Sequence, residues 1–167
     1  AAGTHPRNSE ARHMDFYRLL THEAVKVVTS ASSKKRMMQA IGELAQSAYD
    51  LDAEQVTEAL NERESLGPTG VGHGVALPHA RLDALDEVVG AFVLLEKPID
   101  FSAVDRQPVD IAFALFAPVD AGVEHLKALA LVARTLREPA FCNKLRANRD
   151  PGTLYTILTE SRSDQAA

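Results

Sequence analysis

The sequence predicts an α/β fold in which helices pack on a β-sheet, within a single domain. Two nearly continuous apolar runs, residues 87–95 and 108–117, are typical of strands that are covered on both faces. Segments with helical spacing of apolar residues precede and follow these runs, which is the order expected when helices cover a sheet. The size fits one domain, because the chain has 167 residues, of which 46% are hydrophobic and 25% charged.

The first part of the chain is expected to form a short strand and two helices. β-Branched residues indicate a strand over residues 24–29, and Ser32 or Ser33 can cap a helix that begins near Lys34. A second helix is expected from about Ala53. The apolar residues with helical spacing in these two helices are Met37, Ile41, Leu44 and Ala48, then Val56, Ala59 and Leu60.

The middle of the chain is expected to supply most of the strands. Residues 75–79 read as an extended segment, and Pro78 places this segment at a sheet edge or at a strand end. The two apolar runs follow, and Pro98 together with residues 105–108 is expected to form the turns between them.

The last part of the chain is expected to be helical. A helix is predicted from about Gly122, a short one from Pro139 and a last one around residues 154–158. The inner side of the first of these is expected to hold Leu126, Leu129, Val132 or Ala133, and Leu136.

Charge and composition limit the partners and the compartment. The formal net charge is −5, from 18 basic and 23 acidic residues, which disfavours broad binding to nucleic acid. The single cysteine, Cys142, excludes an intramolecular disulfide and is interpreted as a core thiol. No apolar run approaches the ~20 residues that span a bilayer, and no hydrophobic signal segment opens the chain, so a cytoplasmic protein is expected. Residues 1–13 are interpreted as a remnant of an expression tag, residues 14–161 as the domain and residues 162–167 as a disordered tail.

A glycine-rich stretch is the most unusual local feature. Three glycines at alternate positions, Gly70, Gly72 and Gly74, precede a proline–histidine pair that ends in His79. Glycine allows close approach to the backbone, so these residues suggest a loop whose amides can face a bound group, although a simple turn has the same composition. The dinucleotide fingerprint GxGxxG is absent, because Val75 stands where its third glycine is needed, and no GxSxG nucleophile motif occurs.

His79 is the candidate nucleophile. Imidazole is largely neutral near pH 7, so one ring nitrogen offers a lone pair, and histidine can carry a phosphoryl group with no metal or separate base. A phosphoryl group brings roughly −1.5 to −2 charges and needs hydrogen-bond donors around its oxygens. The candidate donors are Arg63, Thr69, His125 and the amides of the glycine loop, and no cofactor is expected.

Other interpretations of the same residues remain open at this point. His79 can be a structural histidine at a strand end, and Arg63 can belong to a solvated helix face. A zinc-dependent hydrolase could use His73, His79 and His125, although their spacing matches no usual zinc pattern. Asp83 is the candidate fourth ligand of such a site. A protein-binding module without transfer chemistry is a third hypothesis.

Three blocks of the sequence, taken together, carry a family resemblance. They are RESLGPTGVGHGVALPH (63–79), PVDIAFALFAP (108–118) and EHLKAL (124–129). In this order they resemble the fructose/mannitol class of EIIA domains of the bacterial phosphotransferase system, most closely its nitrogen-type regulatory members, over about residues 14–160. The resemblance implies a mixed β-sheet flanked by helices on both faces. It also implies His79 as the phospho-acceptor, with His125 assisting at the phosphate and Arg63 as the arginine before the glycine loop.

The resemblance further implies the partners. In this family the acceptor histidine takes phosphate from a phosphorylated HPr-like carrier, and the protein then acts on regulatory targets or passes the phosphate to an EIIB. The nitrogen-type likeness and the lack of EIIB or EIIC segments favour a regulatory EIIA, with a standalone sugar-specific EIIA as the alternative. Two positions depart from the nitrogen-type pattern: His73 stands where asparagine is usual, and Lys127 where a second histidine is frequent. The sequence leaves the oligomeric state open.

Overall fold

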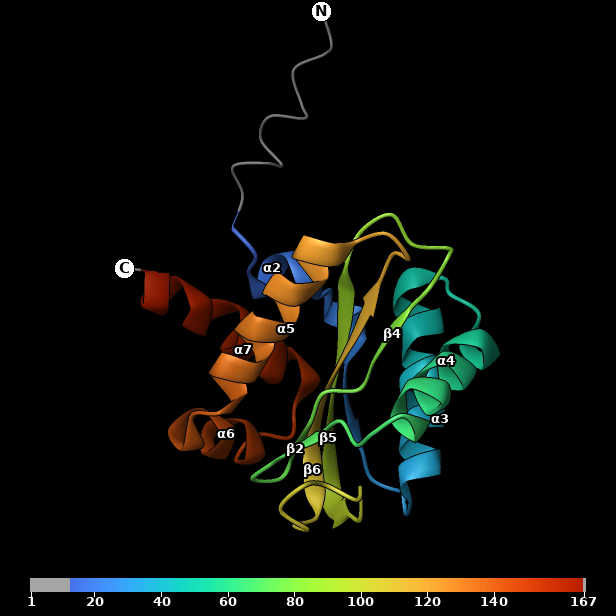
Figure 1. The fold of residues 1–167 in the computed structure, drawn as a ribbon. Coiled ribbons are helices and arrows are strands. Elements are labelled where there is room, and N and C mark those ends of the chain that lie inside the picture. The colour runs from blue at the N-terminus through green and yellow to red at the C-terminus, as the bar shows by residue number, and fades with distance from the viewer. Residues whose placement is uncertain (1–12, 167) are drawn as a thin grey trace, which may run out of the picture.

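The computed structural model describes residues 13–166, with side chains up to Glu160, and holds a mixed six-stranded sheet between two layers of helices (Figure 1). The segment interpreted as a tag remnant therefore lies outside the described residues, except for His13. In chain order the elements are α2 (Phe16–Leu19), η1 (His22–Ala24), β1 (Val25–Val28), α3 (Lys34–Tyr49), α4 (Ala53–Ser65), β2 (Gly70–Gly72), β3 (Val75–Ala76), β4 (His79–Arg81), β5 (Val89–Ile99), β6 (Val109–Ala117), α5 (Gly122–Leu136), α6 (Pro139–Arg146) and α7 (Pro151–Ala166).

The sheet is mixed, and β6 is the strand around which it is organised. The strand order is β1-β5-β6-β3-β2, and β4 also pairs with β6, farther along the strand than β3 does. β1 is parallel to β5, β5 is antiparallel to β6, and β3 and β4 are both parallel to β6. Helices α3 and α4 cover one face, and α5, α6 and α7 lie on the other (Figure 1). The predicted fold class is confirmed.

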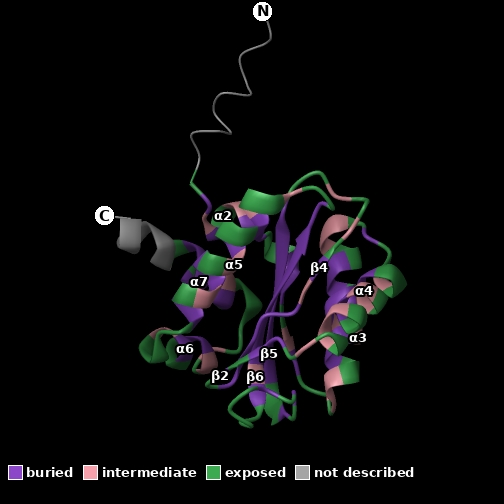
Figure 2. Ribbon diagram, viewed as in Figure 1, coloured by how far each residue is buried: buried purple, intermediate pink, exposed green. Residues whose placement is uncertain are grey.

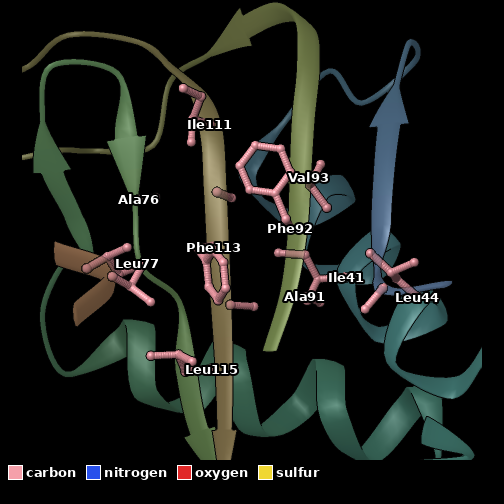
Figure 3. Close-up of a cluster of buried hydrophobic side chains, with 14 of the residues drawn as sticks. Ile41, Leu44, Ala76, Leu77, Ala91, Phe92, Val93, Ile111, Phe113 and Leu115 are labelled. Atoms are coloured by element: carbon pink, nitrogen blue, oxygen red, sulfur yellow. The ribbon is translucent and has the colours of Figure 1, made fainter. Parts of the chain in front are cut away.

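β5 and β6 form the centre of the core. The first seven residues of β5 are buried, as are all residues of β6 except its second (Figure 2). Phe92 pairs with Phe113 across the two strands, with ring centroids 6.3 Å apart, and Phe16 packs edge-on against Phe113 at 5.5 Å. Figure 3 shows the two strand phenylalanines together with Ile41 and Leu44 of α3. Both apolar runs are therefore buried strands, as the sequence predicts.

Side-chain caps begin both helices of the α3–α4 pair. The Ser33 hydroxyl accepts a hydrogen bond from the Arg36 backbone N–H at 3.1 Å, and the Asp52 carboxylate accepts one from the Glu54 N–H at 2.9 Å. Each cap satisfies backbone donors that have no partner inside the helix. The predicted starts of both helices are confirmed.

The prediction of a turn at Pro98 is wrong, because this residue lies inside β5. The register between β5 and β6 shifts between Leu94 and Ile99, so the strand continues past a residue that has no N–H to donate. Pro78, in contrast, does stand at a strand end, between β3 and β4. Its carbonyl accepts a hydrogen bond from the Leu115 N–H at 2.9 Å, which keeps the chain beside β6.

The inner face of α5 also differs from the prediction. Leu126 is 67% exposed, whereas its neighbour His125 is only 5% exposed. The buried residues of this helix are His125, Ala128, Leu131, Val132, Thr135 and Leu136. The prediction is confirmed for Val132 and Leu136 and wrong for Leu126, because the first turn of the helix buries His125 instead.

The last helix extends beyond the predicted end of the domain. α7 is helical through Ala166, whereas the sequence predicts a disordered tail over residues 162–167, of which Ala167 lies outside the described residues. Within residues 13–166, none of the helices is long and apolar enough to cross a membrane.

Replacing Gly42 by alanine is expected to destabilise the fold by about 1–3 kcal/mol, because α3 and α4 touch at this point. A Cβ at Gly42 would lie 2.7 Å from the carbonyl oxygen of Ala53 and would also press on the Thr57 hydroxyl. Gly122→Ala in α5 is the matched control, since a Cβ there meets nothing within 4 Å. It should be neutral or stabilise by roughly 0.5 kcal/mol through helix propensity. Urea unfolding of both variants tests this, and equal effects would contradict it.

Candidate active site

Two histidines meet at the carboxyl end of β6. His79 is the first residue of β4 and pairs with Leu115 of β6, while His125 lies in the first turn of α5, which follows β6 after a short loop. The two ring centroids are 5.6 Å apart, and the rings stand edge to face with an interplanar angle of 73°. Strand register thus brings together two residues that are far apart in the sequence.

The backbone selects the tautomer of His79. Its Nδ1 lies 2.8 Å from the carbonyl oxygen of Leu77. A carbonyl oxygen only accepts, so Nδ1 carries the proton and Nε2 keeps its lone pair. Burial lowers the pKa of His79, and the nearby Arg63 and Arg81 charges lower it further, although the Leu77 contact and Glu64 act in the opposite direction. At neutral pH the ring is therefore uncharged, with Nε2 as a nucleophile.

His125 is buried and lacks a hydrogen-bond partner at one nitrogen. Its Nε2 is shielded from solvent and makes no hydrogen bond among the described residues. Buried polar nitrogens are nearly always paired, so this atom matches an oxygen-bearing group that would sit beside the two rings. Burial lowers the pKa of His125 to about 4, with smaller contributions from His79 and Arg81. The ring is neutral at physiological pH and can donate or accept one hydrogen bond at Nε2, depending on its tautomer.

Arg63 lies at the carboxyl end of α4, near enough for its charge to act on His79. Its Nη1 donates a hydrogen bond to the Gly67 carbonyl at 2.9 Å, which folds the side chain over the segment that leaves the helix. The charge acts on His79, since it lowers the pKa of that ring. The structure therefore brings together the three residues that the sequence proposed for catalysis, namely His79, His125 and Arg63.

Thr69 is near this cluster, but its hydroxyl is already engaged. The side chain is buried, and the hydroxyl donates its proton to the Glu64 carboxylate, which also accepts the Thr69 backbone N–H at 3.0 Å. A hydroxyl has one proton, so Thr69 has none left for a phosphate oxygen. Its carbonyl accepts the Leu77 N–H at 2.9 Å, which places Thr69 behind the backbone that holds His79.

The glycines serve the hairpin and do not meet the imidazoles. Gly72 and Gly74 have φ angles of +100° and +83°, as a tight turn between β2 and β3 requires. The Gly74 carbonyl accepts from the N–H of Ile111 at 3.1 Å, four residues along β6 from the partner of His79, a distance of about 13 Å. Close packing against Ala103 requires a glycine at position 70, because a Cβ there would lie 2.7 Å from the Cβ of Ala103.

Arg81 is a site residue that the sequence reasoning missed. It follows His79 by two positions on β4, so the two side chains share one face of the strand. Its Nη1 donates to the carbonyl oxygens of Pro118, Val119 and Ala121 at 3.4, 3.1 and 3.3 Å. It thereby ties β4 to the loop that delivers His125. The alternation of strand side chains was the signal that could have found it.

The zinc hypothesis finds no ligand set in the part of the chain whose side chains are described. There, no three His, Cys, Asp or Glu side chains come together as a metal site. His73 lies in the hairpin turn between β2 and β3, away from the other two histidines. Its backbone N–H donates to Asp105 at 2.8 Å, and its carbonyl accepts from Arg146 at 3.0 Å.

Comparison with known proteins gives consistent matches. Residues 18–161 match the family model described as phosphoenolpyruvate-dependent sugar phosphotransferase system, EIIA 2. A nitrogen regulatory protein of Bradyrhizobium diazoefficiens is 46% identical over 143 residues, which cover 84% of this chain and 92% of the relative. The structure of the nitrogen regulatory protein IIA-Ntr from Neisseria meningitidis is similar with a TM-score of 0.78 at 33% identity, over 85% of this chain and 97% of that one. The complex of enzyme IIAMTL and phosphorylated enzyme IIBMTL from Escherichia coli shares the fold, with a TM-score of 0.69 at 19% identity, over 83% of this chain and 96% of that one.

Acid should weaken the fold through His125. Its pKa is about 4 in the folded protein and about 6.5 in the unfolded chain, so the unfolded chain binds more protons between these values and stability falls as the pH drops. Lowering the pH from 7 to 5 is expected to cost about 1–2 kcal/mol from this group. His125→Gln should remove that part of the pH dependence. Urea unfolding at both pH values measures it, and an unchanged pH difference in the variant would contradict the assignment.

Proposed function

The chain belongs to the EIIA 2 family of the phosphoenolpyruvate-dependent sugar phosphotransferase system, and on that premise we propose that it is a phosphocarrier of the regulatory, nitrogen type, with Nε2 of His79 as its phospho-acceptor. One observation supports this most directly. The Leu77 carbonyl holds the proton on Nδ1 of His79, so the other ring nitrogen is available as a nucleophile. The half-buried ring can still be reached by a partner protein.

The proposed reaction exchanges one N–P bond for another. Nε2 of His79 attacks the phosphorus of a phosphohistidine on an HPr-like carrier, and the carrier's N–P bond breaks as the new one forms. The electron pair of the broken bond stays on the leaving imidazole of the carrier. Positive charge develops on the His79 ring, and the Leu77 carbonyl bound to Nδ1–H stabilises it.

Arg63 and His125 are proposed to bind the transferred group. The phosphoryl oxygens need donors, and catalysis of such a transfer consists mostly of positioning and charge stabilisation. Arg63 supplies a cation whose field already acts on His79, and Nε2 of His125 is a buried nitrogen without a partner. The dianion would favour the His125 tautomer that carries a proton at Nε2.

The regulatory assignment rests on the nitrogen regulatory relatives rather than on the shared fold. The Bradyrhizobium protein is 46% identical, whereas the mannitol enzyme in complex with its phosphorylated IIB is 19% identical and shows the fold alone. The apolar residues between the glycine stretch and His79, Val75 and Leu77, are buried and are not available to a partner. Apolar side chains that flank His125 in the chain, Val123 and Leu126, are exposed and are proposed as part of the contact.

Incubation with phosphoenolpyruvate, Enzyme I and an HPr-like protein should label the wild type once, on Nε2 of His79. His79→Ala is expected to lose all label, whereas His73→Asn, at the distant hairpin, should keep it. Arg63→Ala and His125→Ala should remain acceptors but react about 10- to 100-fold more slowly, since charge-assisted hydrogen bonds contribute roughly 1.5–3 kcal/mol. Mass spectrometry and ³¹P NMR give the site and the ring nitrogen. A fully labelled His79→Ala protein would overturn the assignment.

The phosphorylated protein is expected to pass its phosphate only slowly to sugar-specific EIIB proteins, while phosphorylation changes its affinity for a regulatory target. Adding a dianion beside an apolar contact costs several kcal/mol unless the partner supplies cations, and about 3 kcal/mol shifts affinity by roughly two powers of ten. Quantitative pull-down of wild-type and phosphorylated protein from the native cell extract, with His79→Ala as control, measures the change. Rapid transfer to an EIIB with unchanged partners would establish the sugar-specific alternative instead.

A further inference from the structure

Glu64 has a buried carboxylate that the proposed reaction does not use. It is the last residue but one of α4, and only 6% of its side chain is exposed. The two oxygens accept two hydrogen bonds, from the Thr69 backbone N–H at 3.0 Å and from the Thr69 hydroxyl, and one of them forms an ion pair with Lys34 Nζ at 2.8 Å. A carboxylate removed from water to this extent needs such partners. One of them, Thr69, also connects Glu64 to the reactive histidine.

A continuous chain of contacts joins this carboxylate to the His79 ring. Glu64 fixes Thr69 through both its backbone N–H and its hydroxyl. The Thr69 carbonyl then accepts the Leu77 N–H at 2.9 Å, and the Leu77 carbonyl lies 2.8 Å from Nδ1 of His79. Leu77, whose carbonyl selects the tautomer of His79, is therefore held through its own N–H by the segment that Glu64 anchors.

Lys34 neutralises Glu64 at a cost to its own helix. The first turn of α3 contains Lys34, Lys35 and Arg36 and no acidic residue, although the positive end of the helix dipole disfavours cations there. Lys34 directs its ammonium to Glu64 at 2.8 Å and also lies 4.7 Å from the centre of the Phe101 ring. Without this cation the site would present a buried negative charge one residue from Arg63.

We propose that Glu64, with Lys34 as its counter-ion, is a positioning residue that keeps His79 in the tautomer with the proton on Nδ1. The proposal rests on the proposed function, in which Nε2 of His79 is the nucleophile. An imidazole that is not held populates both tautomers, and a ring with the proton on Nε2 cannot attack. Loss of Glu64 should thus lower the fraction of reactive histidine while leaving the surface that meets the donor unchanged.

Glu64→Gln is the central variant, because it keeps the size of the side chain and loses the charge. One glutamine oxygen cannot replace two carboxylate oxygens, so at least one contact to Lys34 or Thr69 is lost. Asp110→Asn is the matched control, because it breaks the ion pair with Arg146 (2.9 Å) on another part of the sheet. Both variants lose one partly buried carboxylate charge, but only Glu64→Gln touches the chain of contacts to His79.

The test combines ¹⁵N NMR of the unphosphorylated protein with transfer kinetics from the phosphorylated HPr-like carrier. Wild type and Asp110→Asn should show His79 with Nδ1 protonated and Nε2 as the lone-pair nitrogen, and equal kinetics. Glu64→Gln should show both tautomers and about a tenfold lower maximal rate at an unchanged half-saturating carrier concentration. The tautomer signal does not depend on transfer, so it separates this proposal from the proposed function, which fails if wild type takes no label on His79.

Lys34→Met provides a second measurement if Glu64→Gln unfolds. It leaves the buried Glu64 carboxylate without its cation, which weakens the hold of Glu64 on Thr69, so both His79 tautomers and a slower transfer are expected; adding Glu64→Gln to Lys34→Met should change the rate little further. A single wild-type tautomer in folded Glu64→Gln, or an equal loss of rate in Asp110→Asn, would overturn the proposal. So would independent, additive effects of the Lys34 and Glu64 substitutions.

Discussion

The hydrogen bond from Nδ1 of His79 to the Leu77 carbonyl is the contact on which the chemistry of this fold depends. A neutral imidazole has one nucleophilic nitrogen, and this 2.8 Å contact decides which one it is. The short strands on either side of Pro78, β3 and β4, hold His79 and the Leu77 carbonyl in this contact. Both are parallel to β6 and bonded to it, so the donor and the carbonyl cannot move independently of the central strand.

The site is built from parts that the fold alone does not require. A buried apolar residue in place of His125 would leave no unpaired nitrogen, and a leucine is available one position away in the chain, on the exposed side. The orientation of α5 therefore buries a site residue, His125, where burial of Leu126 would give a more stable core. Arg81 supports the same arrangement, because it ties β4 to the loop from which α5 begins. The costs in stability therefore fall at positions that are proposed to bind phosphate.

Local patterns predicted much of this molecule, and the errors share one cause. Helix caps and buried strands depend on residues that are close together in the sequence. The starts of α3 and α4 and the two central strands were therefore predicted correctly. The family resemblance pointed to His79, His125 and Arg63, which the structure brings together. The burial of Glu64 was not predicted, and the glycines were interpreted as a loop facing a bound group, because burial and strand register depend on residues far away in the chain. The pairing with β6 places the hairpin turn beside Ile111 and His79 beside Leu115, so the turn and the imidazoles lie at different points along this strand.

The neutrality of His125 also bears on how far the phosphoryl group is retained. Whatever binds the group on His79 more tightly than on the donor shifts the exchange equilibrium between the two proteins, by a factor of ten for each 1.4 kcal/mol. A hydrogen bond to a charged group contributes about 1.5–3 kcal/mol, and the proposed bond from Nε2 of His125 to a phosphoryl oxygen is of this kind because its acceptor is an anion. In the unphosphorylated protein the donor ring is neutral, since burial lowers the pKa of His125 to about 4. A phosphoryl dianion beside the ring would raise this pKa, so the proposed retention of the group is linked to uptake of a proton and is stronger at lower pH.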